Sequence, residues 1–383
     1  MNLKKSQFPP INHGAVQVSV KHIYKSDFNA LEVQWLQLEK IATTSFFLSW
    51  KWIGCWLNHL AFDQKIYLVT AKKNILTVGL GIFVEQNIVR HGLIKSKQWL
   101  LHRTGIETKD QIWIENNSLL ICNEDKNEIN NAMWHYLLTN IGYVDEFIIY
   151  VAKKSSLINV NLPSKKYKKI NELHEFGYKM PLIGLSSLQD YLSKRSKNTR
   201  QQFNRSIKHL AKQGEIKFSI IHEKNEQIEL LANSKHWHIE KWHNSPTPSG
   251  FSNAEFNLFH NHILKSSHSS AKTLMAKLTL NKYLIGCIYC LTHEKKVYFY
   301  LSCLKPVADN KIKLGLIMHI LMIEWLISNN EKYSEYDFLA GDARYKKSLS
   351  TTKNEYLKLT IQRSAFKFKI ENKLKKIYKA LIK

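Results

Sequence analysis

The sequence predicts a protein of mixed α/β (α+β) class with two similar domains. Each domain is expected to contain a mixed, mostly antiparallel sheet flanked by helices. The chain has 383 residues, and single domains usually contain about 100–200 residues. Apolar residues make up 44% of the chain and aromatic residues 11%, which suffices for two buried cores. The order strand, helix, helix, three strands, helix, strand is also expected twice along the chain.

The first copy of this order begins with a clear alternation. Val16, Val18 and Val20 alternate with polar residues, which predicts a strand at 16–24. Ser49 is a favourable N-cap for a helix at 50–60. The other elements expected in this half are a helix at 29–41, strands at 65–70, 75–85, 98–102 and 111–114, a helix at 125–141 and a strand at 146–151.

A lysine-rich stretch at 153–169 separates the two copies and is typical of a linker. We therefore expect an N-terminal domain at 1–170, a C-terminal domain at 185–365 and a separate basic helix at 366–383. The elements expected in the second half are a helix at 188–212, a strand at 215–221, helices at 225–242 and 253–264, strands at 274–280, 284–291 and 297–303, a helix at 314–329, and strands at 336–339 and 356–362.

Four segments carry a resemblance to known proteins. They are SFFLSWKWIGCWLNHL at 45–60, YLSKRSKNTRQQFNRSIKHLAKQG at 191–214, HWHIEKW with GF and FNLFH at 236–260, and a strand, helix, strand and GDARYKK loop at 298–349. With the order of elements, they resemble the GNAT superfamily of acyltransferases, and within it the CelD-like family linked to cellulose and exopolysaccharide biosynthesis. That family is similar to the FemAB aminoacyl transferases, which carry two tandem GNAT folds.

The resemblance implies tandem GNAT-like folds and a cleft in the C-terminal half, where two strands diverge after Cys303. An acyl-CoA donor, with acetyl-CoA as the first choice, would lie there and place its phosphates at the N-terminus of the helix at Leu314. The residues that would bind this cofactor are Lys311, Lys313, Gly315, Leu316, Ser302 and Lys346.

The helix start departs from the usual GNAT pattern of Gln or Arg, two residues, Gly, one residue, then Gly or Ala. Only Gly315 matches it. Close packing of the helix on the sheet explains this glycine equally well. Aminoacyl-tRNA, the donor of FemAB-type proteins, therefore stays open as an alternative.

Acyl transfer requires a base for the nucleophile and a proton for the leaving thiolate. Asp337 and Asp342 are candidate bases or acceptor anchors, and their structural alternatives are a strand charge and a turn cap. Tyr345 is a candidate proton donor. Tyr300 shares a strand face with Tyr298 and Ser302 by alternation, so that face lines either the cleft or the core.

Basic residues dominate the charge of the chain: 56 Lys and Arg stand against 31 Asp and Glu, a formal net charge of +25. This excess attracts polyanions, although a lysine-rich composition explains it as well. Seven cations without an intervening acid occupy 194–212, and they form either a solvated helix face or a surface for an anionic substrate or tRNA. The candidate substrate-binding residues are Arg195, Lys197, Arg200, Arg205 and, on the acceptor side, Trp237.

The C-terminal segment 366–383 predicts a basic amphipathic helix. It carries seven lysines and one acid, and Ile370, Leu374, Ile377 and Leu381 form an apolar stripe. We expect this stripe to dock on the protein; the alternative is peripheral contact with an anionic membrane.

These observations predict an acyltransferase that moves an acyl group from an acyl-CoA-like thioester to an amine or hydroxyl of a sugar- or peptide-type acceptor. No metal is expected, and the alternatives are aminoacyl-tRNA-dependent transfer and a non-catalytic binding protein. The longest apolar run, 314–327, is too short to cross a bilayer. Five scattered cysteines and an N-terminus without a secretory signal favour the cytoplasm.

Overall fold

A computed structural model describes residues 8–157, 162 and 166–381, so parts of the expected linker lie outside the described residues. The chain forms two compact units, 1–174 with 356–383, and 175–355, which we call the N-terminal and C-terminal units. The second unit therefore ends at 355 rather than at the expected 365. The reason is that the last strand pairs with a strand of the N-terminal unit.

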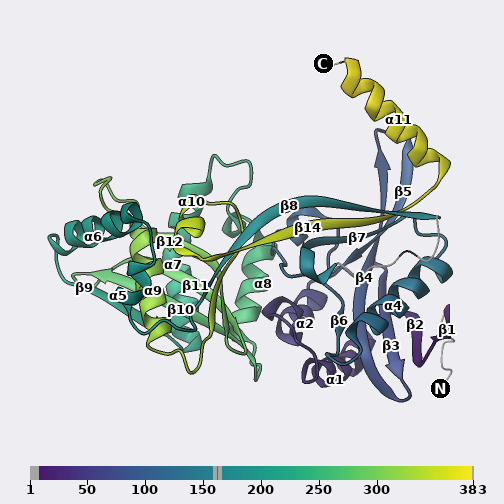
Figure 1. Ribbon diagram of the computed structural model, residues 1–383, viewed down its shortest axis with the longest axis horizontal. Helices are drawn as coiled ribbons and strands as arrows, with labels where there is room; N and C mark the ends of the chain where they lie inside the picture. The colour runs from purple at the N-terminus through teal and green to yellow at the C-terminus, as the bar shows by residue number, and fades with distance from the viewer. Residues whose placement is uncertain (1–7, 158–161, 163–165, 382–383) are drawn as a thin grey trace. The chain divides into compact units, whose positions relative to one another are not determined.

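The C-terminal unit contains one sheet in the order β9-β10-β11-β12-β13-β8 (Figure 1). Every neighbouring pair in it is antiparallel except β12 and β13, which are parallel. Its elements are β8 (Tyr167–Pro181), α5 (Leu188–Ser193), α6 (Lys197–Ala211), β9 (Ile216–Ile221), α7 (Lys224–Trp242), α8 (Ala254–Lys265), β10 (Ala271–Leu280), β11 (Tyr283–His293), β12 (Lys296–Leu304), α9 (Leu314–Ile327), β13 (Glu335–Ala340) and α10 (Arg344–Leu349).

The core of this unit is organised around α9, which is apolar on nearly all sides. Ile317, Ile320 and Ile323 are fully buried in it, together with apolar residues of α5, α6 and the sheet. A helix buried all round needs no polar face, which explains the long apolar run in the sequence. Within the described part of the chain, no helix combines the length and apolar character needed to cross a membrane.

The N-terminal unit repeats this plan with the sheet order β1-β2-β3-β4-β5-β7-β14. Here the parallel pair is β5 with β7. Its elements are β1 (Phe8–His13), β2 (Val16–Ile23), α1 (Phe28–Glu39), α2 (Trp50–Asn58), β3 (Ile66–Lys73), β4 (Leu76–Arg90), β5 (Ile94–Leu101), α3 (Glu107–Asp110), β6 (Leu120–Ile121), α4 (Lys126–Asn140), β7 (Glu146–Lys153), β14 (Thr352–Arg363) and α11 (Phe366–Leu381).

The two units match element by element. The series β2, α1, α2, β3, β4, β5, α4, β7 corresponds to β9, α7, α8, β10, β11, β12, α9, β13. The predicted fold class, α/β with mixed, mostly antiparallel β-structure flanked by helices in each unit, is thereby confirmed. One predicted strand was wrong: residues 111–114 form a turn followed by irregular backbone, and Trp113 has a φ of 49°, in the left-handed region.

Candidate active site

The parallel ladder between β12 and β13 is short. It joins Lys296, Val297 and Tyr298 to the stretch from Glu335 to Asp337 and then ends, whereas β12 continues to Leu304. The strands therefore diverge from Tyr298 onward, earlier than the divergence after Cys303 that the sequence indicated. From that point β12 has an edge without a strand partner on the β13 side among the described residues.

The backbone of β12 presents hydrogen-bonding groups to this open edge. The amide of Lys305 donates to the carbonyl of Ile285 in β11 at 3.0 Å. Because hydrogen-bonding groups alternate in direction along an antiparallel strand, the amides of Ser302 and Leu304 point away from β11. They therefore face the gap, where a ligand can accept their hydrogen bonds.

A cavity of about 460 Å³ occupies this gap. Its walls come from the N-terminal halves of α6 and α9, from α10, from the end of α7, and from the divergent part of β12. The residues that line it are Asn198, Thr199, Gln202, Lys241, Ser302, Leu304, Lys313, Gly315, Leu316, His319, Arg344, Tyr345 and Ser348.

The cavity has a positive electrostatic character. Lys241, Lys313 and Arg344 line it, and none of the described lining residues is a carboxylic acid. Burial lowers the pKa of Lys241, whose ammonium loses hydration in the cavity although the side chain as a whole is exposed. Three cations without a counter-charge in the lining favour an anionic ligand.

The N-terminus of α9 adds to this preference. The first helical hydrogen bond runs from the amide of Ile317 to the carbonyl of Lys313 at 3.0 Å, so the preceding amides lie in the first turn, where helix amides lack intrahelical partners. A Cβ added at Gly315 would lie 3.3 Å from Cδ1 of Leu304. Glycine thus lets α9 approach β12 closely and keeps this turn open to an anion.

His319, which is buried, and Tyr345, which is half-buried, line the cavity side by side. Their rings stack with centroids 5.1 Å apart, and His319 Nδ1 lies 3.0 Å from the Tyr336 hydroxyl. Burial, with a smaller contribution from Lys346 and Lys241, lowers the pKa of His319 to about 3. Burial also raises the pKa of Tyr345. At neutral pH the imidazole is uncharged and the phenol keeps its proton.

Five of the residues singled out in the sequence meet in this cavity: Ser302, Lys313, Gly315, Leu316 and Tyr345. Four of them belong to the expected cofactor-binding set, and Tyr345 is the expected proton donor. They come from β12, the start of α9 and α10. The fold therefore brings together residues that are more than forty positions apart in the sequence.

The two aspartates lie outside the lining residues. Asp337 is fully buried, and its Oδ1 accepts a hydrogen bond from the amide of Leu339 at 2.8 Å. Leu339 has a φ of 60° at an irregularity in β13, so this bond holds a strained turn of the strand. Asp342 is exposed and accepts a hydrogen bond from Tyr178; that bond raises the pKa of Tyr178 to about 12.

Tyr300 also lies elsewhere, because a bulge interrupts β12. Leu301 pairs with Tyr289 and Phe299 pairs with Cys290, which leaves Tyr300 without an opposite residue. Its hydroxyl lies 3.0 Å from His260 Nε2 in α8. The expected common face of Tyr298, Tyr300 and Ser302 was therefore wrong, since a bulge breaks the alternation of side chains.

The two remaining lysines of the expected cofactor set do not line the cavity. Lys346 is buried, and its Nζ donates to the carbonyl of Ala340 at 2.5 Å. Lys311 is exposed, and its carbonyl accepts from the Ser206 hydroxyl at 2.8 Å. Neither is among the cavity-lining residues.

The expected substrate-binding residues lie around α6 and α7. Arg195 is buried and donates to the carbonyl of Ser350 at 2.7 Å, and Arg200 donates to the carbonyl of Ser193 at 3.1 Å. These two arginines hold backbone groups. Lys197 and Arg205 are exposed and Trp237 is half-buried, and none of the three lines the cavity.

Sequence reasoning missed His319, Lys241 and Arg344. His319 had a signal, since it is the only histidine in a largely apolar helix and follows Gly315 by one turn. Lys241 stands beside an acid and among aromatic residues and histidines at 236–243, and Arg344 stands in the basic GDARYKK segment, so nothing local marked either side chain as cavity-lining. The first turn of α6 was noted for its charge, yet its polar residues Asn198, Thr199 and Gln202 reach the cavity.

The corresponding position in the N-terminal unit is closed. β5 and β7 pair from Gln98 to Leu100 only, but Asn117 bridges the two strands beyond that ladder. Its Nδ2 donates to the carbonyl of Leu101 at 2.8 Å, and its amide donates to the carbonyl of Val151 at 3.2 Å. Asn117 is fully buried. The segment that failed to form the predicted strand thus leads into the residue that fills the gap between β5 and β7.

The part of the chain that resembles a known protein family is the part that contains the open cavity of the C-terminal unit. Residues 197–347 match the family model of the acetyltransferase (GNAT) domain. Every cavity-lining residue except Ser348 lies within this GNAT segment. No curated protein matches the chain as a whole or in part. Among described residues, no group of three or more His, Cys, Asp or Glu is arranged to hold a metal ion.

Solved structures resemble the chain over both units. FemX has 10% identity and a TM-score of 0.55, covering 90% of this chain and 97% of FemX. A conserved protein of unknown function from Bacteroides thetaiotaomicron has 10% identity and a TM-score of 0.52, covering 93% and 100%. The C-terminal domain of a putative lysylphosphatidylglycerol synthetase from Agrobacterium fabrum has 11% identity and a TM-score of 0.51, covering 88% and 94%. At such identities these likenesses show the fold alone.

Proposed function

We propose that the C-terminal unit transfers an acyl group from an acyl-CoA-like thioester, with acetyl-CoA as the first choice, to an amine or hydroxyl of a sugar- or peptide-type acceptor. The observation that carries this proposal is the early end of the β12–β13 ladder beside the cavity. The match of this segment to the GNAT domain family supports it. The resemblance of the sequence to proteins of polysaccharide biosynthesis supports a sugar-type acceptor.

The donor would bind in an extended form along the open edge of β12. Its amide-containing arm would pair with the backbone of Ser302 and Leu304, as a further strand would. Its phosphates would meet the first turn of α9 and the ammonium of Lys313. Both contacts use groups on one wall of one cavity, so a single ligand satisfies them together.

Tyr345 is the proton donor in the proposed transfer step, because it lines the cavity and is protonated at neutral pH. The acceptor nitrogen or oxygen attacks the thioester carbonyl, the carbon–sulfur bond breaks, and the leaving thiolate takes the proton of Tyr345. The proton released by the acceptor then returns to the tyrosinate, so the enzyme is unchanged. Neutral His319 stacks on the phenol and orients it. We assign Asp337 and Asp342 to the structure of the β13 end, because both lie outside the cavity lining.

Release of free thiol from acetyl-CoA in the presence of amino sugars, sugar nucleotides and peptide amines tests this proposal. We expect acceptor-dependent thiol release with at least one acceptor class. Binding of the donor without turnover would instead indicate a non-catalytic binding protein. Absence of both binding and turnover with every donor would contradict the proposal.

The basic residues along α6 make aminoacyl-tRNA a second candidate donor, which requires its own test. The first turn of this helix lines the cavity, while Lys197, Arg205, Lys208 and Lys212 lie along it outside the cavity lining. Such a row suits a long phosphate backbone, as in aminoacyl-tRNA. Gel-shift titration with tRNA at rising salt would show a steep loss of affinity if several phosphates are bound; weak, salt-insensitive binding would exclude this donor.

We also propose a cytoplasmic, reducing setting. All five cysteines are free thiols, and four of them are buried, which fits a compartment where disulfides do not form.

A further inference from the structure

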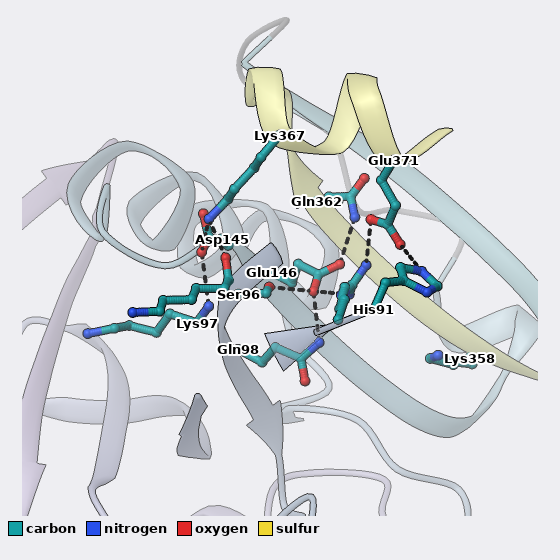
Figure 2. Close-up of polar contacts among 12 residues, drawn as sticks. His91, Ser96, Lys97, Gln98, Asp145, Glu146, Lys358, Gln362, Lys367 and Glu371 are labelled. Carbon is teal, nitrogen blue, oxygen red and sulfur yellow. Dashed lines mark hydrogen bonds and ion pairs between the residues drawn. The ribbon is translucent and has the colours of Figure 1, made fainter. Parts of the chain in front are cut away.

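The C-terminal helix α11 is anchored to the N-terminal unit by one side. Phe368 is 1% exposed and Glu371 is 4% exposed. The Glu371 carboxylate accepts a hydrogen bond from Arg90 of β4 at 3.3 Å, and the Lys367 ammonium donates to Asp145 at 2.8 Å (Figure 2). These contacts attach the helix through two charged groups and one aromatic ring.

The apolar stripe of α11 is not the docked side. Phe366 precedes Ile370 by four residues and Leu374 follows it by four, so Phe366 extends the predicted stripe on the same face of the helix. Their side chains are 76%, 41% and 58% exposed. Docking through the stripe was therefore a wrong expectation for its described part. Ile377 and Leu381 continue the stripe in the sequence, but their side chains lie outside the described ones.

Successive residues of an α-helix are about 100° apart, so, counted from Phe366, the stripe covers roughly 0–80° of the helix, whereas Lys367, Glu371 and Phe368 lie at roughly 100°, 140° and 200°. The anchored side therefore borders the stripe without overlapping it. The helix can thus stay attached through Phe368 and Glu371 while the stripe contacts something else. Figure 1 shows α11, in yellow, extending beyond the strand ends of its own unit. No local unfolding is needed to bring the stripe to a surface.

We propose that the stripe of Phe366, Ile370 and Leu374 inserts into the headgroup region of an anionic lipid bilayer, with α11 lying in the membrane plane. Charge complementarity selects this partner. Segment 366–383 contains seven lysines and a single acid, and that acid, Glu371, is already paired with Arg90. Lys369 and Lys373 are exposed beside the stripe, where they would meet lipid phosphates.

Co-sedimentation of the full chain with vesicles tests this inference. We expect binding to phosphatidylcholine vesicles that contain phosphatidylglycerol, and little binding to phosphatidylcholine alone. The variant F366S/I370S/L374S should bind the anionic vesicles at least roughly tenfold more weakly than the wild type, because three inserted apolar side chains are lost. The variant K369Q/K373Q should lose affinity for the anionic vesicles at low salt.

The matched control is F62S/I75S/Y283S. Its three wild-type side chains are 93%, 96% and 77% exposed, so it loses comparable apolar surface outside α11 and should bind as the wild type does. Circular dichroism and thermal melts verify that each variant is folded, and the single change Phe366→Ser offers a milder second readout with a smaller loss of binding.

Three results would overturn the inference. The first is wild-type protein that stays in solution with both kinds of vesicle. The second is a stripe variant that binds anionic vesicles as strongly as the control variant. The third is stripe-dependent dimerisation in sedimentation velocity without lipid, which would assign the stripe to a second copy of the chain.

Discussion

Tyr345 is the residue on which the proposed chemistry depends most. Its phenol keeps its proton because burial raises the pKa, and the stacked His319 fixes its ring. Replacing it by phenylalanine keeps the stacking but removes the proton. We expect Tyr345→Phe to lower kcat by about 100- to 10,000-fold and to change KM for the donor little.

Steady-state thiol-release kinetics measure this effect. Tyr333→Phe is the matched control, since that ring packs on Trp325 outside the cavity and its loss of a hydroxyl should leave kcat unchanged. A wild-type kcat in Tyr345→Phe would remove Tyr345 from the proton transfer.

Asp337 lends itself to a test that separates structure from catalysis. Its Oδ1 accepts the Leu339 amide, and an asparagine retains that acceptor while an alanine does not. We expect Asp337→Ala to lower the free energy of unfolding by about 1–3 kcal/mol, because a buried amide loses its partner. Asp337→Asn should be milder in stability and close to wild type in kcat. A collapse of kcat in a stable Asp337→Asn protein would restore the aspartate as the base.

At the scale of elements, Glu146 ties together neighbouring strands of the N-terminal unit. This carboxylate is 1% exposed and accepts hydrogen bonds from Arg90, Ser96, Gln98 and Gln362 (Figure 2). Glu146→Ala removes one of the two carboxylates that Arg90 contacts and leaves the buried side-chain amides of Gln98 and Gln362 without this acceptor.

We therefore expect Glu146→Ala to cost about 3–5 kcal/mol in the free energy of unfolding, measured by urea denaturation. Glu172→Ala is the comparison, since Glu172 is 57% exposed in its side chain and forms a surface pair with Lys358; its effect should stay within about 0.5 kcal/mol. Equal effects of the two changes would mean that the Glu146 cluster does not hold the strands.

Elements with strong local patterns could be predicted from the sequence, whereas their long-range partners could not. The meander of β10, β11 and β12 and the apolar α9 follow from alternation, turns and burial. β14 was expected in the C-terminal domain, but its residues from Tyr356 to Gln362 pair with β7, and no local pattern encodes that choice. The bulge at Tyr300 was equally invisible, because an inserted residue leaves the composition of a strand unchanged.

The candidate site was predictable only where local sequence patterns place its residues. Gly315 stands at a helix start that the order of elements locates. Tyr345 stands in the GDARYKK segment, which was expected as a loop and forms the short helix α10. His319, Lys241 and Arg344 reach the cavity from three different helices, so their meeting depends on packing. The residue type of Asp337 suggested a catalytic base, but its carboxylate accepts a hydrogen bond from the backbone amide of Leu339.

At the scale of the whole molecule, buried neutral histidines should make stability depend on pH. Burial lowers the pKa of His319 to about 3, and that of His102 and His238 to about 4. Between these values and the ordinary value of about 6.5, the unfolded chain binds more protons than the folded one. The free energy of unfolding therefore falls as pH falls through this window, by up to about 1.4 kcal/mol per pH unit for each histidine.

Thermal melts between pH 7 and pH 4 measure this dependence. A variant that keeps side-chain size and hydrogen bonding, H102Q/H238Q/H319Q, should show a flatter decline of Tm with falling pH than the wild type. An equally steep decline in both proteins would attribute the acid sensitivity to other groups.

The open edge of β12 is tested most directly by hydrogen–deuterium exchange of the full chain with and without coenzyme A. Bound donor should slow exchange of the amides of Ser302 and Leu304 and of those in the first turn of α9, because these amides would donate to the ligand. The counterpart strand β5, whose neighbouring gap Asn117 closes, should be unaffected. Unchanged exchange along β12 and α9 at saturating coenzyme A, or equal protection of β5, would contradict a donor site at this edge.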